Sequence, residues 1–527
     1  MLSITIPGCI EAAGVELDFR RMQLPRNLKH HYGPPLASAC WEMRDIEQGD
    51  KINVDEDREV GHYWLRYLDG KAPPKSKDIV KDAVSENEEA IENIRLFHEE
   101  VFKGNFDKIL WIGIGGSGLG PQMLYDVLRT PGAKPAMFFF DNTDPDGFKR
   151  TLQEIRLKEG GLEKTLTVVV SKGGSTPETA NGMQVAKEAY EEDGVAFEQH
   201  AVAITQAGSK LDKKAGPPDP EDPDTEGPEW LRRFPLWHWV GGRTSLLSPV
   251  GILPATLLGF DVAELRAGAS AMDELTRNTR EFNKNAALQL AAAWYNTAET
   301  RGLRNMVVLP YCDRLATLSK YLQQLIMESL GKNGKGITVF GNKGSTDQHS
   351  YVQQLREGYA DFFATFIRVV DASVDYVLDA DTGVTAGDYL AAFQEGTAQA
   401  LSDAGRPSMR LTIQKLDERS LGALVALFER VVGYYGALLG INSYHQPGVE
   451  AGKKAAGTIL ALQTRLIELL QNAQGDAISV KCLAKETKTT AAGVFEILDR
   501  LFRCGRYGLE ADTNGAEGIA DVQFRIG

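Results

Sequence analysis

Residues 108–120 read KILWIGIGGSGLG, in which an apolar run passes directly into a glycine-rich segment. The run predicts a buried β-strand, and the spacing of apolar residues from about Leu119 onward predicts a helix. Between them, Gly113, Gly115 and Gly118 satisfy the spacing GxGxxG. Glycines at such a turn let backbone N–H groups approach an anion at the N-terminus of the helix. The stretch therefore indicates a doubly wound α/β fold with an anion-binding turn.

The same order of strand and helix recurs along most of the chain. Further strands are expected at 136–140, 166–170, 201–205, 305–310, 336–340 and 363–370. Amphipathic helices are expected at 82–101 and at 313–330. One parallel sheet can hold the earlier strands and a second sheet the later ones. We therefore predict the fold class α/β, with two doubly wound parallel-sheet domains of three layers (α/β/α) and with helical N- and C-terminal extensions.

The 527 residues exceed a single domain of ~100–200 residues and predict a division into segments. We expect an N-terminal arm with helices over 1–74, a first domain over 75–260 and a second domain over 261–474, in which helices dominate from 388 to 472. A small module over 475–527 follows, with helices at 479–487 and 491–502 and a strand at 523–526, as in a winged helix. Residues 217–228, PPDPEDPDTEGP, contain five prolines and five carboxylates and predict an exposed loop.

The charge balance argues against two classes of partner. The 58 Lys+Arg and 72 Asp+Glu give a net charge of −14, which disfavours nonspecific binding to nucleic acid or to an anionic membrane. The module over 475–527 has 7 basic and 8 acidic residues and so lacks the basic surface of a DNA-binding wing. The longest apolar stretch, 421–441, contains Glu429 and Arg430 and predicts a buried core helix rather than a membrane span. We expect neither nucleic acid nor a membrane as a partner.

Cysteine usage and the N-terminal composition predict the compartment. The five cysteines form no CxxC pair, as is typical of scattered reduced thiols. Glu11, Glu16 and Asp18 do not fit a secretory or transit peptide. The expected location is cytoplasmic. Neither HExxH, nor paired histidines, nor an Asp-rich calcium loop occurs, and no metal site is expected.

A second anion-binding loop is predicted where the strand at 166–170 runs into SKGGSTPET, residues 171–179. Its hydroxyls and the N–H groups of its two glycines can surround a phosphate group. Helix capping alone would explain the same hydroxyls, so the pattern allows both readings. A dinucleotide site also stays open, because Asp141 follows the second predicted strand.

Four further motifs contain residues that could act in catalysis. Arg243 follows two glycines among apolar residues, where a buried cation needs an anionic partner. Gln324 and Glu328 lie one turn apart at the edge of the apolar face of the helix at 313–330, where a carboxylate can act as a general base. His349 near a helix start could move protons, and Lys453 could reach a cleft. Solvent-facing positions explain His349 and Lys453 equally well, and for Glu328 the spacing alone favours an ordinary place on the helix surface.

Six segments carry a resemblance to a known family. In chain order they are IGIGGSGLGP, SKGGSTPET, GGRTSLLS, MESLGK, GSTDQHSYVQQ and QPGVEAGK, within about residues 108–456. The first segment alone also suits a dehydrogenase, but the order of all six is specific. On these segments the chain resembles the glucose-6-phosphate isomerase (phosphoglucose isomerase) family, whose members are built on two sugar-isomerase domains.

The resemblance implies reversible isomerisation of glucose 6-phosphate to fructose 6-phosphate, in glycolysis and gluconeogenesis, without metal or organic cofactor. It implies that Glu328 moves a proton between C2 and C1 through a cis-enediol, and that Arg243 stabilises the enediolate oxygen. His349 and Lys453 would assist ring opening. Family members are commonly dimers in which the residue matching His349 enters the partner's site, so the resemblance implies a homodimer with shared sites.

The resemblance also implies a set of substrate-binding residues. Two residues next to members of this set, Gly173 and His445, differ from the residues common at these positions in the family. The phosphate would be held by Ser171, Lys172, Ser175 and Thr176, and the sugar would be lined by Gly116 and Ser117. The sugar hydroxyls or neighbouring groups would be bound by Glu178, Gln324 and Gln446. Two other functions stay open: a sugar-phosphate-binding sensor with a C-terminal wing, and an NAD-dependent oxidoreductase that uses GxGxxG and Asp141.

Overall fold

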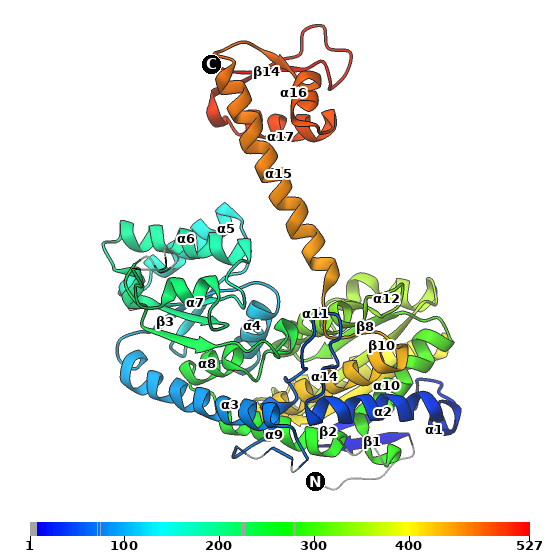
Figure 1. The fold of residues 1–527 in the computed structure, drawn as a ribbon. Coiled ribbons are helices and arrows are strands. Elements are labelled where there is room, and N and C mark those ends of the chain that lie inside the picture. Colours follow the sequence, from blue (N-terminus) through cyan, green and yellow to red (C-terminus); the bar gives the residue numbers. More distant parts are fainter. Residues whose placement is uncertain are drawn as a thin grey trace. The chain divides into compact units, whose positions relative to one another are not determined.

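A computed structural model describes residues 8–70, 72–73, 75–220, 222, 225, 227–277 and 281–527, apart from the side chains of Val449, Glu450, Ala451 and Lys453. The chain divides into two compact units, Met1–His445 and Gln446–Gly527 (Figure 1). The first unit contains two separate β-sheets, and the second contains one small sheet. Each unit is described below by itself.

The first sheet of the larger unit is entirely parallel, as the sequence predicts. It consists of β3 (Lys108–Ile112), β4 (Ala136–Phe140), β5 (Thr165–Val170), β6 (Ala201–Thr205) and β7 (Arg232–Pro235), in the order β4-β3-β5-β6-β7. Ile109 and Trp111 of β3 contribute to the core on one face, whereas Leu110 and Ile112 contribute to the core on the other. This alternation makes the central strands apolar on both faces, as three layers require.

Helices cover both faces of this sheet. On the face of Trp111 lie α3 (Asp78–Phe97), α4 (Gly116–Leu128) and α8 (Pro249–Leu257). On the other face lie α5 (Pro145–Arg156), α6 (Pro177–Glu192) and α7 (Lys210–Ala215). The carboxyl ends of β3 and β5 lead into α4 and α6, so the two glycine-rich loops lie at the same edge of the sheet.

The second sheet has six strands in the order β1-β2-β11-β10-β8-β9. The parallel part consists of β8 (Asn305–Tyr311), β9 (Thr338–Gly341), β10 (Phe362–Asp371) and β11 (Ser408–Lys415). The hairpin of β1 (Cys9–Ala12) and β2 (Val15–Asp18) adds to β11 in antiparallel orientation. Helices α12 (Gln348–Glu357) and α13 (Ala386–Asp403) pack on one face, and α10 (Ala286–Tyr295), α11 (Ala316–Leu330) and α14 (Glu418–Leu439) pack on the other.

The structure adds four strands to the sequence prediction, at three places in the chain. The N-terminal segment forms the β1–β2 hairpin besides its helices, so the second sheet is not parallel throughout. The interval 388–472 is interrupted by β11, whose apolar residues Met409, Leu411 and Ile413 alternate as in a strand between two long helices. The edge strand β7 is short and ends in a proline, and it has little sequence signal.

The apolar stretch around Glu429 and Arg430 forms α14, a core helix as predicted. Within the part of the chain that the structure describes, it is the one helix with the length and hydropathy of a membrane span, but 94% of its apolar stretch is buried inside the protein. Gly268 of α9 (Val262–Thr276) and Gly422 of α14 allow the two helices to approach closely, since a Cβ atom at Gly422 would lie 2.0 Å from the carbonyl oxygen of Leu265.

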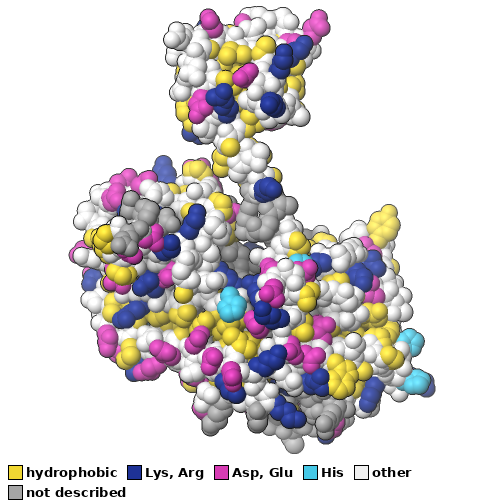
Figure 2. Space-filling view, in the orientation of Figure 1, with side chains coloured by type: hydrophobic (Ala, Val, Ile, Leu, Met, Phe, Trp, Pro, Cys, Tyr) yellow, Lys and Arg dark blue, Asp and Glu magenta, His cyan; other side chains and the backbone are white. Residues whose placement is uncertain are grey.

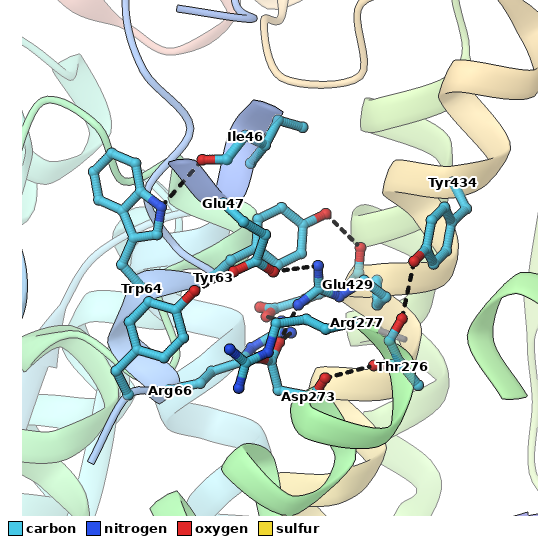
Figure 3. Close-up of polar contacts among 12 residues, drawn as sticks. Ile46, Glu47, Tyr63, Trp64, Arg66, Asp273, Thr276, Arg277, Glu429 and Tyr434 are labelled. Carbon is cyan, nitrogen blue, oxygen red and sulfur yellow. Dashed lines mark hydrogen bonds and ion pairs between the residues drawn. The ribbon is translucent and has the colours of Figure 1, made fainter. Parts of the chain in front are cut away.

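A buried network of ion pairs neutralises the charges on α14 (Figure 3). Arg66 donates to Asp273 at 2.8 Å and to Glu429 at 2.5 Å, and Arg430 pairs with Asp273 and, at 2.5 Å, with Glu47. Burial by itself raises the pKa of Asp273, but the guanidinium groups of Arg430 and Arg66 hold that pKa below its ordinary value. The network joins α2 (Gly33–Gln48), α9 and α14, and it explains how a charged pair lies inside an apolar helix.

The smaller unit has its own hydrophobic core. It contains α15 (Pro447–Asn472), α16 (Val480–Thr487) and α17 (Ala491–Arg503), and a sheet of β12 (Ile478–Ser479), β14 (Gln523–Ile526) and β13 (Leu509–Asp512) in that order. The visible face of this unit in Figure 2 carries basic, acidic and apolar side chains intermixed. The boundary between the units lies before α15, whereas the predicted module begins after this helix.

Candidate functional site

The predicted general base, Glu328, lies in the last turn of α11 between two hydrogen-bond donors. Nε2 of Gln324, one helical turn earlier, donates to Oε2 of Glu328 at 2.8 Å. A guanidinium nitrogen of Arg243 donates to Oε1 at 3.0 Å. The Glu328 side chain keeps 18% of its exposure, whereas the Arg243 side chain keeps 4%. The carboxylate is therefore oriented through both oxygens and still borders solvent.

The guanidinium of Arg243 is held on several sides. Its Nε donates to Oγ of Ser329 at 2.6 Å, and another nitrogen donates to the carbonyl oxygen of Ser443 at 2.6 Å and to that of His445 at 3.3 Å. Burial lowers the pKa of Arg243, and the nearby Glu328 carboxylate opposes this effect. Because the ordinary pKa of arginine is so high, the group stays charged at neutral pH. A fixed cation thus lies beside the base.

The glycine-rich turn before α4 packs against the segment that carries Arg243. A Cβ atom at Gly116 would lie 2.1 Å from the carbonyl of Gly242, and one at Gly115 would lie 3.1 Å from Nε2 of Gln324. Gly115 also has a φ of +59°, which favours glycine. Ser117 follows in the first turn of α4, where its carbonyl oxygen accepts a hydrogen bond from Nε1 of Trp111 at 2.7 Å. The glycines therefore allow the first loop and the Arg243 segment to lie in contact.

This contact bears on the dinucleotide alternative. In a dinucleotide site, the second glycine of the turn must let a pyrophosphate approach the backbone. Here the second glycine is Gly115, whose Cβ position lies 3.1 Å from Nε2 of Gln324, and the backbone of Gly242 and Arg243 fills the space beside the next residue, Gly116. Asp141 is exposed at the end of β4. The geometry therefore does not favour the dinucleotide reading. In the part of the chain that the structure describes, no group of three or more His, Cys, Asp and Glu residues could hold a metal ion.

The second loop, between β5 and α6, is closed by its own hydroxyl groups. Oγ of Ser171 accepts a hydrogen bond from the N–H of Gly174 at 3.1 Å and lies 3.4 Å from Oγ1 of Thr176. Gly174 has a φ of +70°, and a Cβ atom there would lie 2.3 Å from the backbone nitrogen of Leu211. The predicted phosphate hydroxyls of Ser171 and Thr176 are thus side by side, and Ser175 is exposed next to them.

Lys172 connects the second loop to the segment 238–243, which carries Arg243. Its Nζ donates to the carbonyl oxygens of His238 at 2.7 Å and Val240 at 2.8 Å. Burial, and to a lesser degree the positive charge of Arg58, lower the pKa of Lys172 to about 7. An ammonium group has three donors, so two carbonyl acceptors leave one N–H for a further acceptor.

Two of the other predicted residues do not contact the charged pair directly. Among the described residues, neither Glu178 nor His349 forms a hydrogen bond or ion pair with Arg243 or Glu328. His349 is exposed in the first turn of α12, and Glu178 has a buried oxygen, Oε2, that accepts no hydrogen bond from a described residue. Gln446 and Lys453 belong to the smaller unit, and the Lys453 side chain lies outside the described residues.

Two residues that accept hydrogen bonds from Arg243, Ser329 and Ser443, have no role in the sequence prediction. Ser329 is a small polar residue within the apolar stripe of α11, and this interruption of the stripe was an available signal. Ser443 contributes its carbonyl oxygen, which any residue type could supply. Its contribution therefore left no signal in the sequence.

Comparisons with known proteins identify the family of the chain. The family model described as phosphoglucose isomerase matches residues 36–400 and 390–468. The chain belongs to the phosphoglucose isomerase family. It is 45% identical over 517 residues to the glucose-6-phosphate isomerase of Geobacter sp., covering 94% of this chain and 93% of that protein. The corresponding enzyme of Synechococcus elongatus is 44% identical over 518 residues, covering 96% and 93%.

A solved structure of this family has the same fold. The crystal structure of a glucose-6-phosphate isomerase from Chlamydia trachomatis matches with a TM-score of 0.77 and 26% identity, over 87% of this chain and 90% of that one. The matched segments of the family model contain Arg243, Glu328 and Lys453. Residues 469–527, which form most of the smaller unit, lie outside those segments.

Proposed function

We propose that this member of the phosphoglucose isomerase family interconverts glucose 6-phosphate and fructose 6-phosphate, without a metal ion or organic cofactor. The single observation that carries the proposal is the fixed Glu328 carboxylate, between Arg243 at 3.0 Å and Gln324 at 2.8 Å. A base with its charge partner already in place loses little energy to reorganisation when charge develops during the reaction.

The proposed chemistry is a proton transfer within the open-chain sugar. Glu328 accepts the proton from C2, the C1–C2 double bond forms, and the electrons of the C1 carbonyl move to O1. The protonated carboxylate then returns its proton to C1, the proton of O2 is transferred to O1 to give the C1 hydroxyl, and the electrons of the O2–H bond form the C2 ketone. The Arg243 guanidinium stabilises the negative oxygen of the cis-enediolate. His349 and Lys453 supply the acid and base for ring opening.

The proposed phosphate site is the second loop. Hydroxyls of Ser171 and Thr176, backbone N–H groups and the third N–H of Lys172 are the donors that a phosphate dianion needs. Ser117 and Ser175 complete this part of the site, and Glu178 and Gln446 support the sugar. We place these residues in two sugar-isomerase domains, over 75–260 and 261–474. A cytoplasmic location is part of the proposal and fits five free cysteine thiols.

The proposal includes a homodimer in which His349 acts in the site of the partner subunit. Exposed apolar side chains gather on the segment after β10 and on α13, a helix that packs beside α12, the helix of His349. These side chains are Val374, Tyr376, Val377, Leu378, Tyr389 and Phe393. Apolar surface of this kind is typical of protein interfaces.

Mixing two inactive variants tests the shared site. If His349 acts across the interface, subunits with Glu328→Gln and subunits with His349→Ala form mixed dimers with one complete site. After subunit exchange, the mixture should regain up to about a quarter of the wild-type activity, whereas each variant alone stays inactive. A monomer in sedimentation experiments, or no recovery in verified mixed dimers, contradicts the shared site.

The isomerase proposal is tested with fructose 6-phosphate in EDTA, following glucose 6-phosphate. The wild type should turn over, and Glu328→Gln should lose about 10²–10⁴-fold in kcat, the range for loss of a general base. The control is Glu92→Gln on the exposed face of α3, which should keep full activity. Tight sugar-phosphate binding without turnover in the wild type would favour the sensor, and hydride transfer with a nicotinamide cofactor would favour the oxidoreductase.

A further inference from the structure

The side chain of Arg243 lines a small chamber. Its volume is about 20 Å³, and its lining includes His62, Arg243, Ser329, Glu429 and Ser443. A cavity of about this size is large enough for one water molecule, provided that polar groups face it. Apart from Arg243, the residues that line the chamber have no part in the proposed chemistry.

Two of its lining side chains have buried polar atoms without a partner. His62 and Ser443 are each only 2% exposed. Nε2 of His62 and Oγ of Ser443 form no hydrogen bond with any residue that the structure describes. A buried polar group without a partner is costly, and such groups are normally satisfied by ordered water where direct bonds are missing. Because both side chains line the chamber, a water molecule there is a candidate partner for both atoms.

Ser443 is held firmly in this position. Its carbonyl oxygen accepts from Arg243 at 2.6 Å. A Cβ atom at Gly436 would lie 1.7 Å from Oγ of Ser443, so the glycine in α14 provides the space for this hydroxyl. A displacement of Ser443 would therefore move an acceptor of the Arg243 guanidinium.

The side chain of His62 also lines the chamber and is buried. Its ring lies 3.9 Å from the ring of Tyr63, whose hydroxyl donates to the carbonyl oxygen of Glu429 at 3.2 Å. Burial, and the positive charges of Arg66, Arg430 and Arg243, keep the pKa of His62 well below its ordinary value. The imidazole is therefore neutral, with one nitrogen that donates and one that accepts.

We propose that one ordered water occupies this chamber and bridges Nε2 of His62 and Oγ of Ser443. The bridge makes His62 a positioning residue: it holds Ser443, and through Ser443 the guanidinium of Arg243, at a fixed place behind the base Glu328. The catalytic part of this inference rests on the proposed isomerase function. A small displacement of a group that stabilises a transition state reduces turnover more than it reduces substrate binding.

The water itself is tested by a crystal structure of the wild type at a resolution that shows ordered solvent. We expect one density peak within hydrogen-bond distance of Nε2 of His62 and Oγ of Ser443, and its loss in Ser443→Ala. A dry chamber in the wild type overturns the proposal. This readout does not depend on activity, so it separates a failure of this inference from a failure of the proposed isomerase function.

Positioning is tested with variants that preserve volume. His62→Phe keeps the ring and removes Nε2, whereas His62→Gln places an amide near the position of Nε2. We expect His62→Phe and Ser443→Ala each to lower kcat by about 10-fold with KM changed less than about 2-fold, and His62→Gln to stay within about 3-fold of the wild type.

The double variant distinguishes a shared water from two separate effects. If both residues act through one water, His62→Phe with Ser443→Ala should be no slower than the slower single variant. Multiplied losses, or a loss in KM with kcat unchanged, would overturn the positioning role. If His62→Phe fails to fold, as a thermal melt would show, the rescue by His62→Gln and the Ser443→Ala structure still decide the proposal.

Discussion

A guanidinium nitrogen of Arg243 lies 3.0 Å from Oε1 of Glu328, although the two residues are 85 positions apart in the chain. The pair joins the turn after β7 to the last turn of α11, and Oγ of Ser329, the next residue, accepts from Nε of the same arginine at 2.6 Å. Two neighbouring residues on one helix thus fix a planar group through two of its nitrogens. An ammonium group cannot reproduce this geometry.

Arg243→Lys should therefore impair turnover strongly while the charge is conserved. We expect kcat to fall by about 10²–10³-fold, the range for loss of one stabilising donor, with a smaller change in KM. Steady-state kinetics with fructose 6-phosphate measures both. The matched control is Arg95→Lys, at an exposed arginine paired with Glu92 on α3. Equal effects of the two substitutions would contradict the role of Arg243.

Gly116→Ala tests the contact between the first loop and the Arg243 segment. The added Cβ atom would lie 2.1 Å from the carbonyl of Gly242, so the loop and the Arg243 segment must separate. We expect kcat/KM to fall more than about 10-fold, since a shift near 1 Å in a catalytic group has large effects. Gly33→Ala at the start of α2, where a Cβ atom meets nothing within 4 Å, is the control and should keep full activity.

Substrate binding should be coupled to protonation of Lys172. Its pKa is lowered to about 7 by burial, and a phosphate dianion beside Nζ raises this pKa again. At about pH 8, binding of fructose 6-phosphate should therefore take up protons, which calorimetry in two buffers of different ionisation enthalpy detects. The Glu328→Gln background prevents turnover, and adding Lys172→Met should abolish the uptake. Identical heats in both buffers would argue against a neutral Lys172.

The same lysine should affect stability in a defined pH window. Between about pH 7 and its ordinary pKa of 10.5, the unfolded chain binds more protons at Lys172 than the folded chain does. Burial of the charged Lys172 side chain therefore lowers the free energy of unfolding by its full amount below about pH 7. This loss becomes smaller as the pH rises. The stability difference between Lys172→Met and the wild type should shift in favour of the wild type between about pH 6 and pH 9, measured by denaturant unfolding. A constant difference would contradict the depressed pKa.

Arg66→Met should destabilise the protein, because it leaves the carboxylates of Asp273 and Glu429 with one cation fewer inside the core. Removing one partner of a buried ion pair typically costs about 3–5 kcal/mol. Chemical denaturation measures this loss of unfolding free energy. The control is Arg95→Met, whose pair with Glu92 is exposed, and its denaturation midpoint should not change. Equal midpoints for both variants would mean that the network does not stabilise the fold.

The sequence alone determined what depends on local pattern. Apolar runs before glycine-rich turns predicted β3 and β5 within a residue or two, and the amphipathic stripe of α11 predicted that Gln324 and Glu328 are neighbours one turn apart. These features follow from the periodicity of a single element, which the order of residues contains directly. Segments in a characteristic order also predicted the family, which the comparisons confirm.

Only the tertiary structure decided which distant residues meet. No local pattern shows that Gly242 fills the space beside Gly116, that Lys172 donates to the carbonyl of Val240, or that the carbonyl of Ser443 holds Arg243. The first two contacts form between loops that parallel strands bring to one edge, and the third joins such a loop to the segment after α14. Backbone carbonyls are the same in every residue type. The sequence therefore named the charged groups of the site, and the packing of the loops around Arg243 decided their geometry.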